Sequence, residues 1–259
     1  MLVSAINISV LLRALGKHVN LFLLLQYSIL SWGIGILTPG NIGDFSLAFL
    51  LKKHDVTLGQ GTAIVFIDKV ITVLILSLTA LIGFFIFFGL SYLVLFPLFV
   101  FVAFLGGLCC ILFFPSLRHL VARFIPQKYA MALQGLIATI MLMLRSKKLY
   151  LVANALFTIL KWILSSLVIF LIFLSLHVTA NLIYIYIFFI TMTLTLFNLI
   201  PITYHGIGLK EAAGIYLYGL KGISPDVVLS AYLVLHFISY SISFFAVLTL
   251  LDHFKKPVI

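Results

Sequence analysis

Long apolar runs recur from one end of this chain to the other, and they limit what it can fold into. Several exceed 18 residues, such as those over 57–88, 92–114 and 149–176. A helix of about 20 apolar residues crosses the roughly 30 Å hydrocarbon core of a bilayer. A membrane β-strand would alternate apolar and polar residues, and these runs do not alternate. The runs therefore predict an all-α, polytopic membrane helical bundle.

Composition excludes a water-facing surface of ordinary extent. Charged residues make up only 8% of the chain and hydrophobic residues 64%, whereas an average soluble domain has about 25% charged residues. The only cysteines, Cys109 and Cys110, are adjacent within an apolar run. They offer neither a disulfide framework nor metal-ligand spacing, so we expect no metal and no cofactor.

The net charge of +10 raises the question of nucleic-acid binding. The basic residues stand at the ends of apolar runs, however, at Arg13 and Lys17, Lys52 and Lys53, Arg145, Lys147 and Lys148, and Lys255 and Lys256. Basic residues in these places mark the cytoplasmic ends of membrane helices. We therefore expect no nucleic-acid partner, a location in a prokaryotic cytoplasmic (inner) membrane, and a cytoplasmic C-terminus.

The order of runs predicts a single integral membrane domain over 1–259 with about seven spans. In chain order we expect a short first helix over 1–12, spans over 19–38, 57–88, 92–114, 149–176, 180–200 and 225–251, and an interfacial helix over 129–144. The first helix is shorter than a span, which suggests a truncated end or a surface anchor. Thr57 is the expected N-cap of the long helix that ends near Phe88.

Two broken stretches interrupt this pattern and resemble each other. Each follows a span that ends at proline, contains glycines with an acid just after the last of them, and leads into a capped span: 39–54 with Asp44, and 201–222 with Glu211. The basic ends give the two units opposite orientations. Paired Gly/Pro-interrupted segments in inverted repeats indicate the binding site of many transporters. We expect repeat 1 over about 1–90, a connection over about 91–148 and repeat 2 over about 149–259, with two re-entrant or broken helices.

The same residues resemble two motifs of the flippase-like family that includes the transmembrane region of lysylphosphatidylglycerol synthases. The first motif has the form Pro-Gly-x-x-Gly-acid and is matched by Pro39, Gly40, Gly43 and Asp44, with Asp in place of Glu. The second is matched by Pro201, Gly206, Gly208, Glu211 and Ala212. The resemblance implies a membrane flippase-like fold over nearly the whole chain.

Three departures from the family pattern bear on the substrate. An arginine that often follows the first motif is missing, His205 stands where the second motif usually has glycine, and the first helix is short. The soluble aminoacyltransferase domain of the bifunctional members is not expected after residue 259. The resemblance therefore implies lipid transport without synthase activity.

Charged residues inside apolar runs are the remaining site candidates, because a charge at the bilayer centre costs about 2.5 to 3.5 kcal/mol and is usually used or paired. Asp68 and Lys69 are consecutive, point about 100° apart on a helix and cannot pair with each other. Lys161 is the expected partner of Asp68, in a structural ion pair or in a site. The predicted substrate-binding residues are Asn41, Gly43, Asp44, Asp68, Lys69, Lys161, His205, Gly206, Gly208, Lys210 and Glu211.

These features favour a protein that translocates a phospholipid or a polyprenyl-phosphate-linked sugar and is not an enzyme. The alternatives are a small-solute carrier and a non-transporting partner or scaffold of an envelope glycosyltransferase or aminoacyltransferase. A membrane enzyme that uses two cavity acids for acid/base chemistry is a third. The expected partners are a membrane lipid or lipid-linked sugar and an envelope biosynthesis enzyme.

Overall fold

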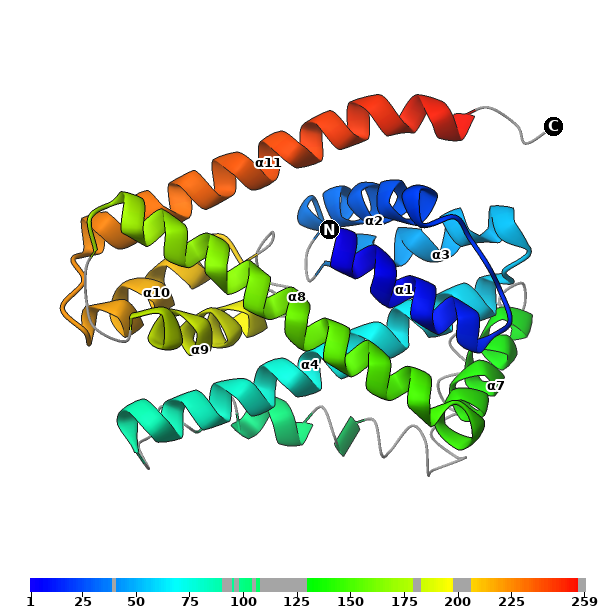
Figure 1. The fold of residues 1–259 in the computed structure, drawn as a ribbon, viewed down its shortest axis with the longest axis horizontal. Helices are drawn as coiled ribbons and strands as arrows, with labels where there is room; N and C mark the ends of the chain where they lie inside the picture. Colours follow the sequence, from blue (N-terminus) through cyan, green and yellow to red (C-terminus); the bar gives the residue numbers. More distant parts are fainter. Residues whose placement is uncertain are drawn as a thin grey trace.

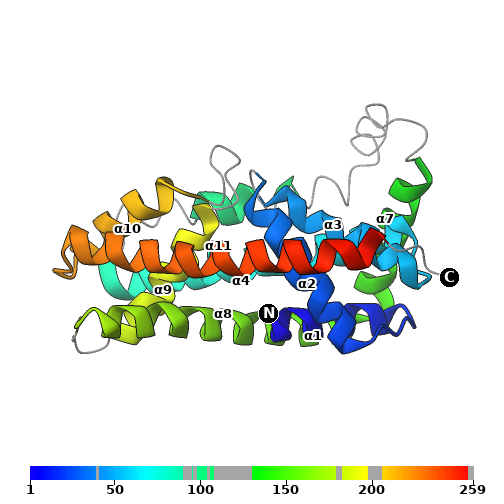
Figure 2. The ribbon, with the colours of Figure 1, turned by 90° about the horizontal axis from the view of Figure 1, so that it is seen from above.

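The computed structural model describes residues 1–38, 41–89, 95, 98–103, 106–107, 130–178, 183–197 and 206–255. Every regular element in these ranges is helical (Figures 1 and 2), as predicted. The elements are α1 (Leu2–Ala14), α2 (Leu21–Ile36), η1 (Ile42–Phe45), α3 (Ser46–Leu51), η2 (Lys52–His54), α4 (Leu58–Phe88), α7 (Ala130–Ser146), α8 (Lys148–Ser175), α9 (Ile183–Leu196), α10 (Leu209–Gly219) and α11 (Pro225–Lys255).

Local signals set the limits of the longest helices. The hydroxyl of Thr57 accepts from the backbone N–H of Gln60 at 3.3 Å, and the Gln60 side chain accepts from the N–H of Thr57 at 3.1 Å. This capping box satisfies two donors at the start of α4. The helix ends at Phe88, and Gly89 follows at φ 62°, a conformation that glycine adopts without strain. The predicted N-cap and end of this helix are both confirmed.

Three helices of the described part are long and apolar enough to cross a membrane: Leu58–Phe88, Lys148–Ser175 and Pro225–Leu248. Four others, α1, α2, α7 and α9, are apolar but have 10 to 17 residues. The predicted span over 92–114 lies mostly outside the described residues. The integral membrane bundle is therefore confirmed, and the count of about seven spans stays a prediction.

Two main clusters of buried apolar side chains form the hydrophobic core of the described residues. One core joins α1, α2, α3, α4 and α7. The other joins α8, α9, α10 and α11 with the end of α4. A smaller cluster between them consists of Leu76 and Ala80 of α4 with Met192 and Leu196 of α9.

The helices that join the halves pack in a symmetric pattern. α1 packs against α8, α2 against α11, and α4 against α9. If α1, α2 and α4 correspond to α8, α9 and α11, exchanging the halves reproduces these same pairs. Figure 1 shows α4 running away from the end of the molecule where α7 lies, whereas α11 runs toward it. Corresponding helices therefore run in opposite directions, which is the arrangement that the inverted repeat predicts.

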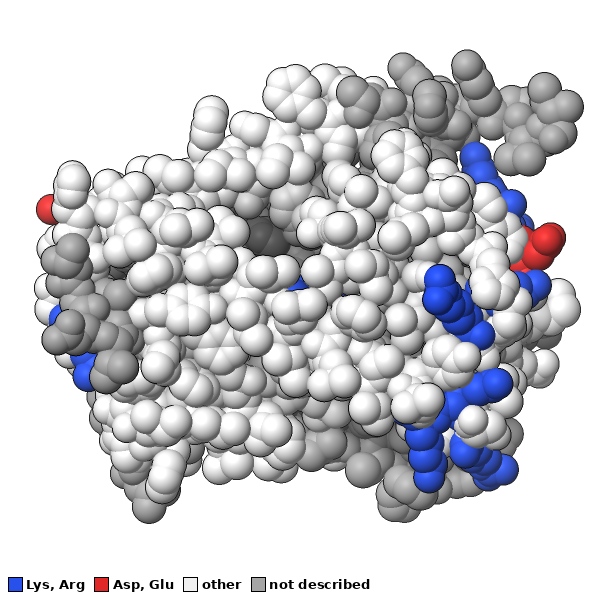
Figure 3. All heavy atoms as spheres, in the orientation of Figure 1, with Lys and Arg blue, Asp and Glu red and all other residues white. Residues whose placement is uncertain are grey.

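Many large apolar side chains of the described residues are exposed. Large side chains such as Phe85, Leu149 and Phe237 are more than half exposed, as expected of a helix bundle in contact with lipid. In Figure 3, Lys and Arg gather mainly at the end where α7 and the start of α8 lie. Exposed basic residues of the described part include Arg13, Lys52, Lys53, Arg145 and Lys148.

Helix α7 crosses this basic end. Both ribbon views show it transverse to the long helices (Figures 1 and 2). It packs directly on the start of α4, where a Cβ on Gly59 would lie 2.5 Å from the carbonyl oxygen of Ala132 and 2.9 Å from the Cα of Gly135. Small residues allow two helix backbones to approach this closely. A helix across the end of the bundle is compatible with the predicted interfacial segment.

Candidate functional site

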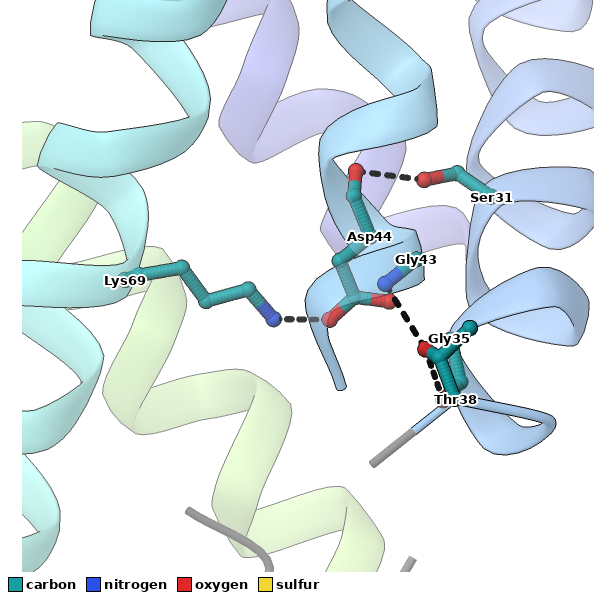
Figure 4. Close-up of polar contacts among 6 residues, drawn as sticks. All are labelled: Ser31, Gly35, Thr38, Gly43, Asp44 and Lys69. Carbon is teal, nitrogen blue, oxygen red and sulfur yellow. Dashed lines mark hydrogen bonds and ion pairs between the residues drawn. The ribbon is translucent and has the colours of Figure 1, made fainter. Parts of the chain in front are cut away.

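The first break is a tight turn fastened to the end of α2. Asn41 adopts a left-handed conformation at φ 56°, which asparagine tolerates better than most residues. The N–H of Gly43 donates to the hydroxyl of Thr38 at 2.7 Å, and the hydroxyl of Ser31 donates to the carbonyl oxygen of Asp44 at 2.6 Å (Figure 4). These bonds hold η1 against α2 and fix the position of the Asp44 backbone.

Asp44 forms an ion pair across the bundle. The ammonium of Lys69, from α4, donates to Asp44 Oδ2 (Figure 4). The other carboxylate oxygen lies against Gly35, where any Cβ would clash with it. The Asp44 and Lys69 side chains are 15% and 36% exposed. The pair therefore ties the broken stretch to a long helix, and both residues were predicted site residues.

Asp68 has other partners than the one predicted. Its Oδ1 accepts from the amide of Asn7 at 2.8 Å and from the amide of Asn154 at 3.2 Å. Asn7 also donates to the hydroxyl of Thr158 at 2.9 Å. Within the described part of the chain, Lys161 forms no direct ion pair with Asp68, so the predicted direct pairing is wrong, although both side chains line the same cavity and the Asp68 charge acts on Lys161. Two amides from α1 and α8 take the place of the expected cation.

Lys161 is consequently a cation without a direct ion pair in the described residues, since no carboxylate oxygen there lies within 4.0 Å of it. Its Nζ lies 5.6 Å from the centre of the Trp162 ring. Lys161 is near the middle of α8, roughly 20 Å from the start of the helix at 1.5 Å per residue. A charge at this depth is expensive unless something compensates it.

These side chains surround one cavity of about 490 Å³, within the range of about 300 to 1,000 Å³ that is usual for ligand sites. Helices α1, α2, α4 and α8 and the first break provide most of its lining. Five predicted site residues meet there: Asn41, Asp44, Asp68, Lys69 and Lys161.

Several hydrogen-bond donors in the cavity lining are unused. Ser28 Oγ, Thr72 Oγ1 and Trp162 Nε1 line the cavity and are buried without a hydrogen-bond partner among the described residues. An indole N–H can only donate, and a hydroxyl can donate one hydrogen bond. Together with the Lys161 ammonium they form a surface suited to an acceptor-rich group.

A second hollow, of about 480 Å³, lies between α2 and α11 and has a different character. Its lining is mainly apolar, and the residues that form it are Phe22, Leu25, Gln26, Ile29, Ser241, Ile242, Phe245 and Ala246. None of them is ionisable. This groove suits hydrocarbon rather than a charged group.

The second break is fastened to its own long helix. Glu211 Oε2 accepts from the N–H of Gly208 at 2.5 Å, which caps the start of α10. Glu211 Oε1 lies 2.5 Å from Nε2 of His236, on α11. Lys210, predicted to bind substrate, has a buried side chain. Neither Glu211 nor Lys210 lines the 490 Å³ cavity.

Corresponding positions of the two breaks are related by a constant offset of 167 residues. Asp44 and its partner Lys69 are 25 residues apart, as are Glu211 and its partner His236. The same offset relates the residues that precede α4 and α11, Thr57 and Ser224. Each break thus carries an acid that binds a basic side chain at the same position of the following long helix.

The predicted site residues therefore divide into two groups. Asn41 and Asp44 of the first break line the cavity together with Asp68, Lys69 and Lys161. Gly43 lies in the turn beside it. Gly206, Gly208, Lys210 and Glu211 belong to the second break, and His205 lies outside the described residues. Asn7 and Asn154, whose amides bind Asp68, were not among the predicted site residues, although each is a polar residue in an apolar helix.

The fold and cavity define an integral membrane helical protein with charged groups enclosed between its helices. A family model described as the lysylphosphatidylglycerol synthase TM region matches residues 1–246. The chain therefore belongs to this family, which confirms the resemblance of the two motifs. No curated protein and no solved structure matches the chain.

Proposed function

We propose that the protein translocates an amphiphilic lipid whose headgroup carries a phosphate, either a phospholipid or a polyprenyl-phosphate-linked sugar. The headgroup passes through the 490 Å³ cavity while the hydrocarbon tails stay in the bilayer. The observation that carries this proposal is Lys161, a mid-helix cation that lines the cavity without a direct ion pair in the described residues. The role involves no covalent step.

The ligand chemistry follows from what the cavity leaves unsatisfied. Asp44 is neutralised by Lys69, and Asp68 accepts two amide hydrogen bonds. The groups that remain are the Lys161 ammonium, which only the more distant Asp68 and Asp44 charges offset, and the unused donors of the lining. A phosphate supplies negative charge and several acceptor oxygens, and charge-assisted hydrogen bonds are about twice as strong as neutral ones. A phosphate thus compensates the cost of keeping Lys161 charged at this depth.

The basic end of the molecule indicates how the protein is oriented in the membrane. Lys and Arg of the described part gather where α7 crosses the bundle (Figure 3), and such clusters stay on the cytoplasmic side. We therefore place this end at the cytoplasmic face of a prokaryotic inner membrane. Since α11 runs toward the same end (Figure 1), the C-terminus is cytoplasmic in this arrangement, and the chain crosses the membrane several times.

The test is lipid movement in vesicles containing the purified protein. Phosphatidylglycerol with a fluorophore on its acyl chain is added, and the fraction accessible to an impermeant quencher is followed with time. The Lys161→Met variant is expected to move lipid more slowly by about tenfold or more, because a hydrogen bond to a charged group contributes about 1.5 to 3 kcal/mol. Lys161→Met should be at least as thermostable as the wild type, because it removes a charge that is costly at this depth and breaks no direct ion pair.

Lys148→Met is the matched control, because it makes the same change at an exposed position on the same helix. It should retain the wild-type rate. If wild-type protein moves neither phosphatidylglycerol nor a polyprenyl-phosphate sugar faster than empty vesicles do, the lipid role is wrong and a non-transporting partner of an envelope enzyme becomes the better reading. Uptake of soluble phosphates without lipid movement would instead favour a small-solute carrier.

A further inference from the structure

The hydrogen bond between Glu211 and His236 joins the short helix of the second break to the long helix that follows it. Glu211 is in the first turn of α10, the short helix of the second break, and His236 is on α11. Their side chains are 15% and 16% exposed. His236 lies roughly 16 Å along α11 from its start, so the contact is well inside the long helix.

The geometry assigns protons to this pair. Glu211 Oε2 accepts from the N–H of Gly208, and Oε1 contacts Nε2 of His236. An ionised carboxylate can only accept, so beside it the imidazole carries a proton on Nε2 and donates it to Oε1. Its Nδ1 makes no hydrogen bond among the described residues and is left as the basic nitrogen. One further proton can bind there, which turns a neutral imidazole beside a carboxylate into an imidazolium–carboxylate ion pair.

The surroundings of the pair contain few other charges. Besides His236, the described titratable groups on which the Glu211 charge acts are Lys210 on α10 and the phenols of Tyr232 and Tyr240 on α11. The two phenol rings lie 6.3 and 6.1 Å from the His236 ring, one helical turn on either side. Helix α9, which packs on α10, contributes Tyr186, whose hydroxyl donates to the Leu217 carbonyl. Helices α2 and α8, which pack on α11, contribute no described group to this set.

His236 in the second half occupies the position that Lys69 occupies in the first half. There the acid of the break binds Lys69, a side chain that keeps its proton at neutral pH. In the second half a histidine takes its place, and histidine is the side chain that ordinarily changes charge between about pH 5 and pH 8. One break thus has a permanent cation and the other a cation that depends on proton binding.

We propose that Glu211 and His236 form a proton-binding site that controls how firmly the second break is held against α11, and that its occupancy regulates passage through the protein. With the proton bound, the charge-assisted hydrogen bond closes the contact between α10 and α11. Without it, a neutral imidazole still donates to the carboxylate, but the ion-pair attraction is lost, and the weaker contact lets α10 move. The proton site does not depend on the identity of the transported molecule.

Two measurements on the full-length protein in vesicles test the proposal. In the first, spin labels at Ala212 of α10 and Leu233 of α11, both exposed, report the distance between these helices at about pH 5.5 and about pH 8. The wild type should show a narrower distance distribution at the lower pH. His236→Gln keeps an N–H donor but cannot bind the proton, so its distribution should be the same at both pH values.

The second measurement is lipid translocation at the same two pH values. The wild-type rate should change severalfold between them, whereas His236→Gln should have a constant rate. His18→Gln, which changes an exposed histidine after α1, should keep the wild-type response. Glu211→Gln should also lose the response, since the ion pair can no longer form.

The outcomes separate the proton site from the lipid role. A pH-dependent distance in a wild-type protein that moves no lipid supports the proton site and removes the proposed function. A wild-type distance that is independent of pH overturns the proton site. So does a His236→Gln variant that retains the wild-type response in either measurement.

Discussion

Replacing Lys69 by methionine is expected to destabilise the protein, because it leaves the Asp44 carboxylate without its cation. Asp44 cannot turn away easily. Its backbone is held by the Ser31 hydroxyl, and one of its carboxylate oxygens lies against Gly35 (Figure 4). Methionine keeps most of the volume of lysine, so the change isolates the loss of charge.

The exposure of the two side chains sets the magnitude. Removing one partner of a fully buried ion pair costs about 3 to 5 kcal/mol, whereas a fully exposed pair contributes about 0 to 1 kcal/mol. With Asp44 15% and Lys69 36% exposed, we expect a loss of about 1 to 3 kcal/mol. The double variant Asp44→Asn with Lys69→Met should recover much of this loss, because no unpaired charge remains.

The assay is thermal unfolding of purified protein, followed by tryptophan fluorescence. The chain has two tryptophans, Trp32 and Trp162, and both line the cavity, so the signal reports on the region that is changed. For a chain of this size 1 kcal/mol corresponds to about 2 to 4 °C in Tm, which gives a decrease of about 2 to 12 °C for Lys69→Met. A Tm within about 1 °C of the wild type, or a double variant as unstable as the sum of the single ones, would refute this reasoning.

Two further variants test the rest of the site. Gly43→Ala would place a Cβ 2.6 Å from a backbone carbonyl oxygen of α2, and we expect a loss of about 1 to 3 kcal/mol. Gly219→Ala, where no atom lies within 4 Å of the added carbon, should have little effect in the same unfolding assay. Asn7→Leu removes one of the two amides that bind Asp68 and should lower stability by about 1 to 3 kcal/mol. A normal Tm for Asn7→Leu would show that Asp68 does not need both amides.

The helices and breaks could be predicted because their signals are local. Apolar runs give the helices, the Thr57 cap gives the start of α4, and Asn41 with its neighbouring glycines gives the first break. Each of these depends on residues that are close in sequence. In the structure α4 begins after Thr57 and ends at Phe88, as the sequence predicts.

The partners of the charged residues could not be predicted because they are set by helix crossings. Asp68 binds Asn7 and Asn154, which are 61 and 86 residues away. Lys161 was the expected partner on charge alone, since the sequence does not show which face of α8 meets α4. Asp44 and Lys69 were each predicted site residues, but the sequence did not indicate that they bind each other.

The equivalent positions of the two breaks explain how a symmetric fold could work asymmetrically. In both halves an acid that follows the break binds a basic residue 25 positions later, so both short helical segments are held by the same kind of contact. If both cations were permanent, pH would affect the two breaks alike. A lysine in one half and a histidine in the other makes only the second contact sensitive to protons. Since α4 and α11 run in opposite directions (Figure 1), a change in pH would act on the second break and leave the contact between Asp44 and Lys69 at the first break unchanged.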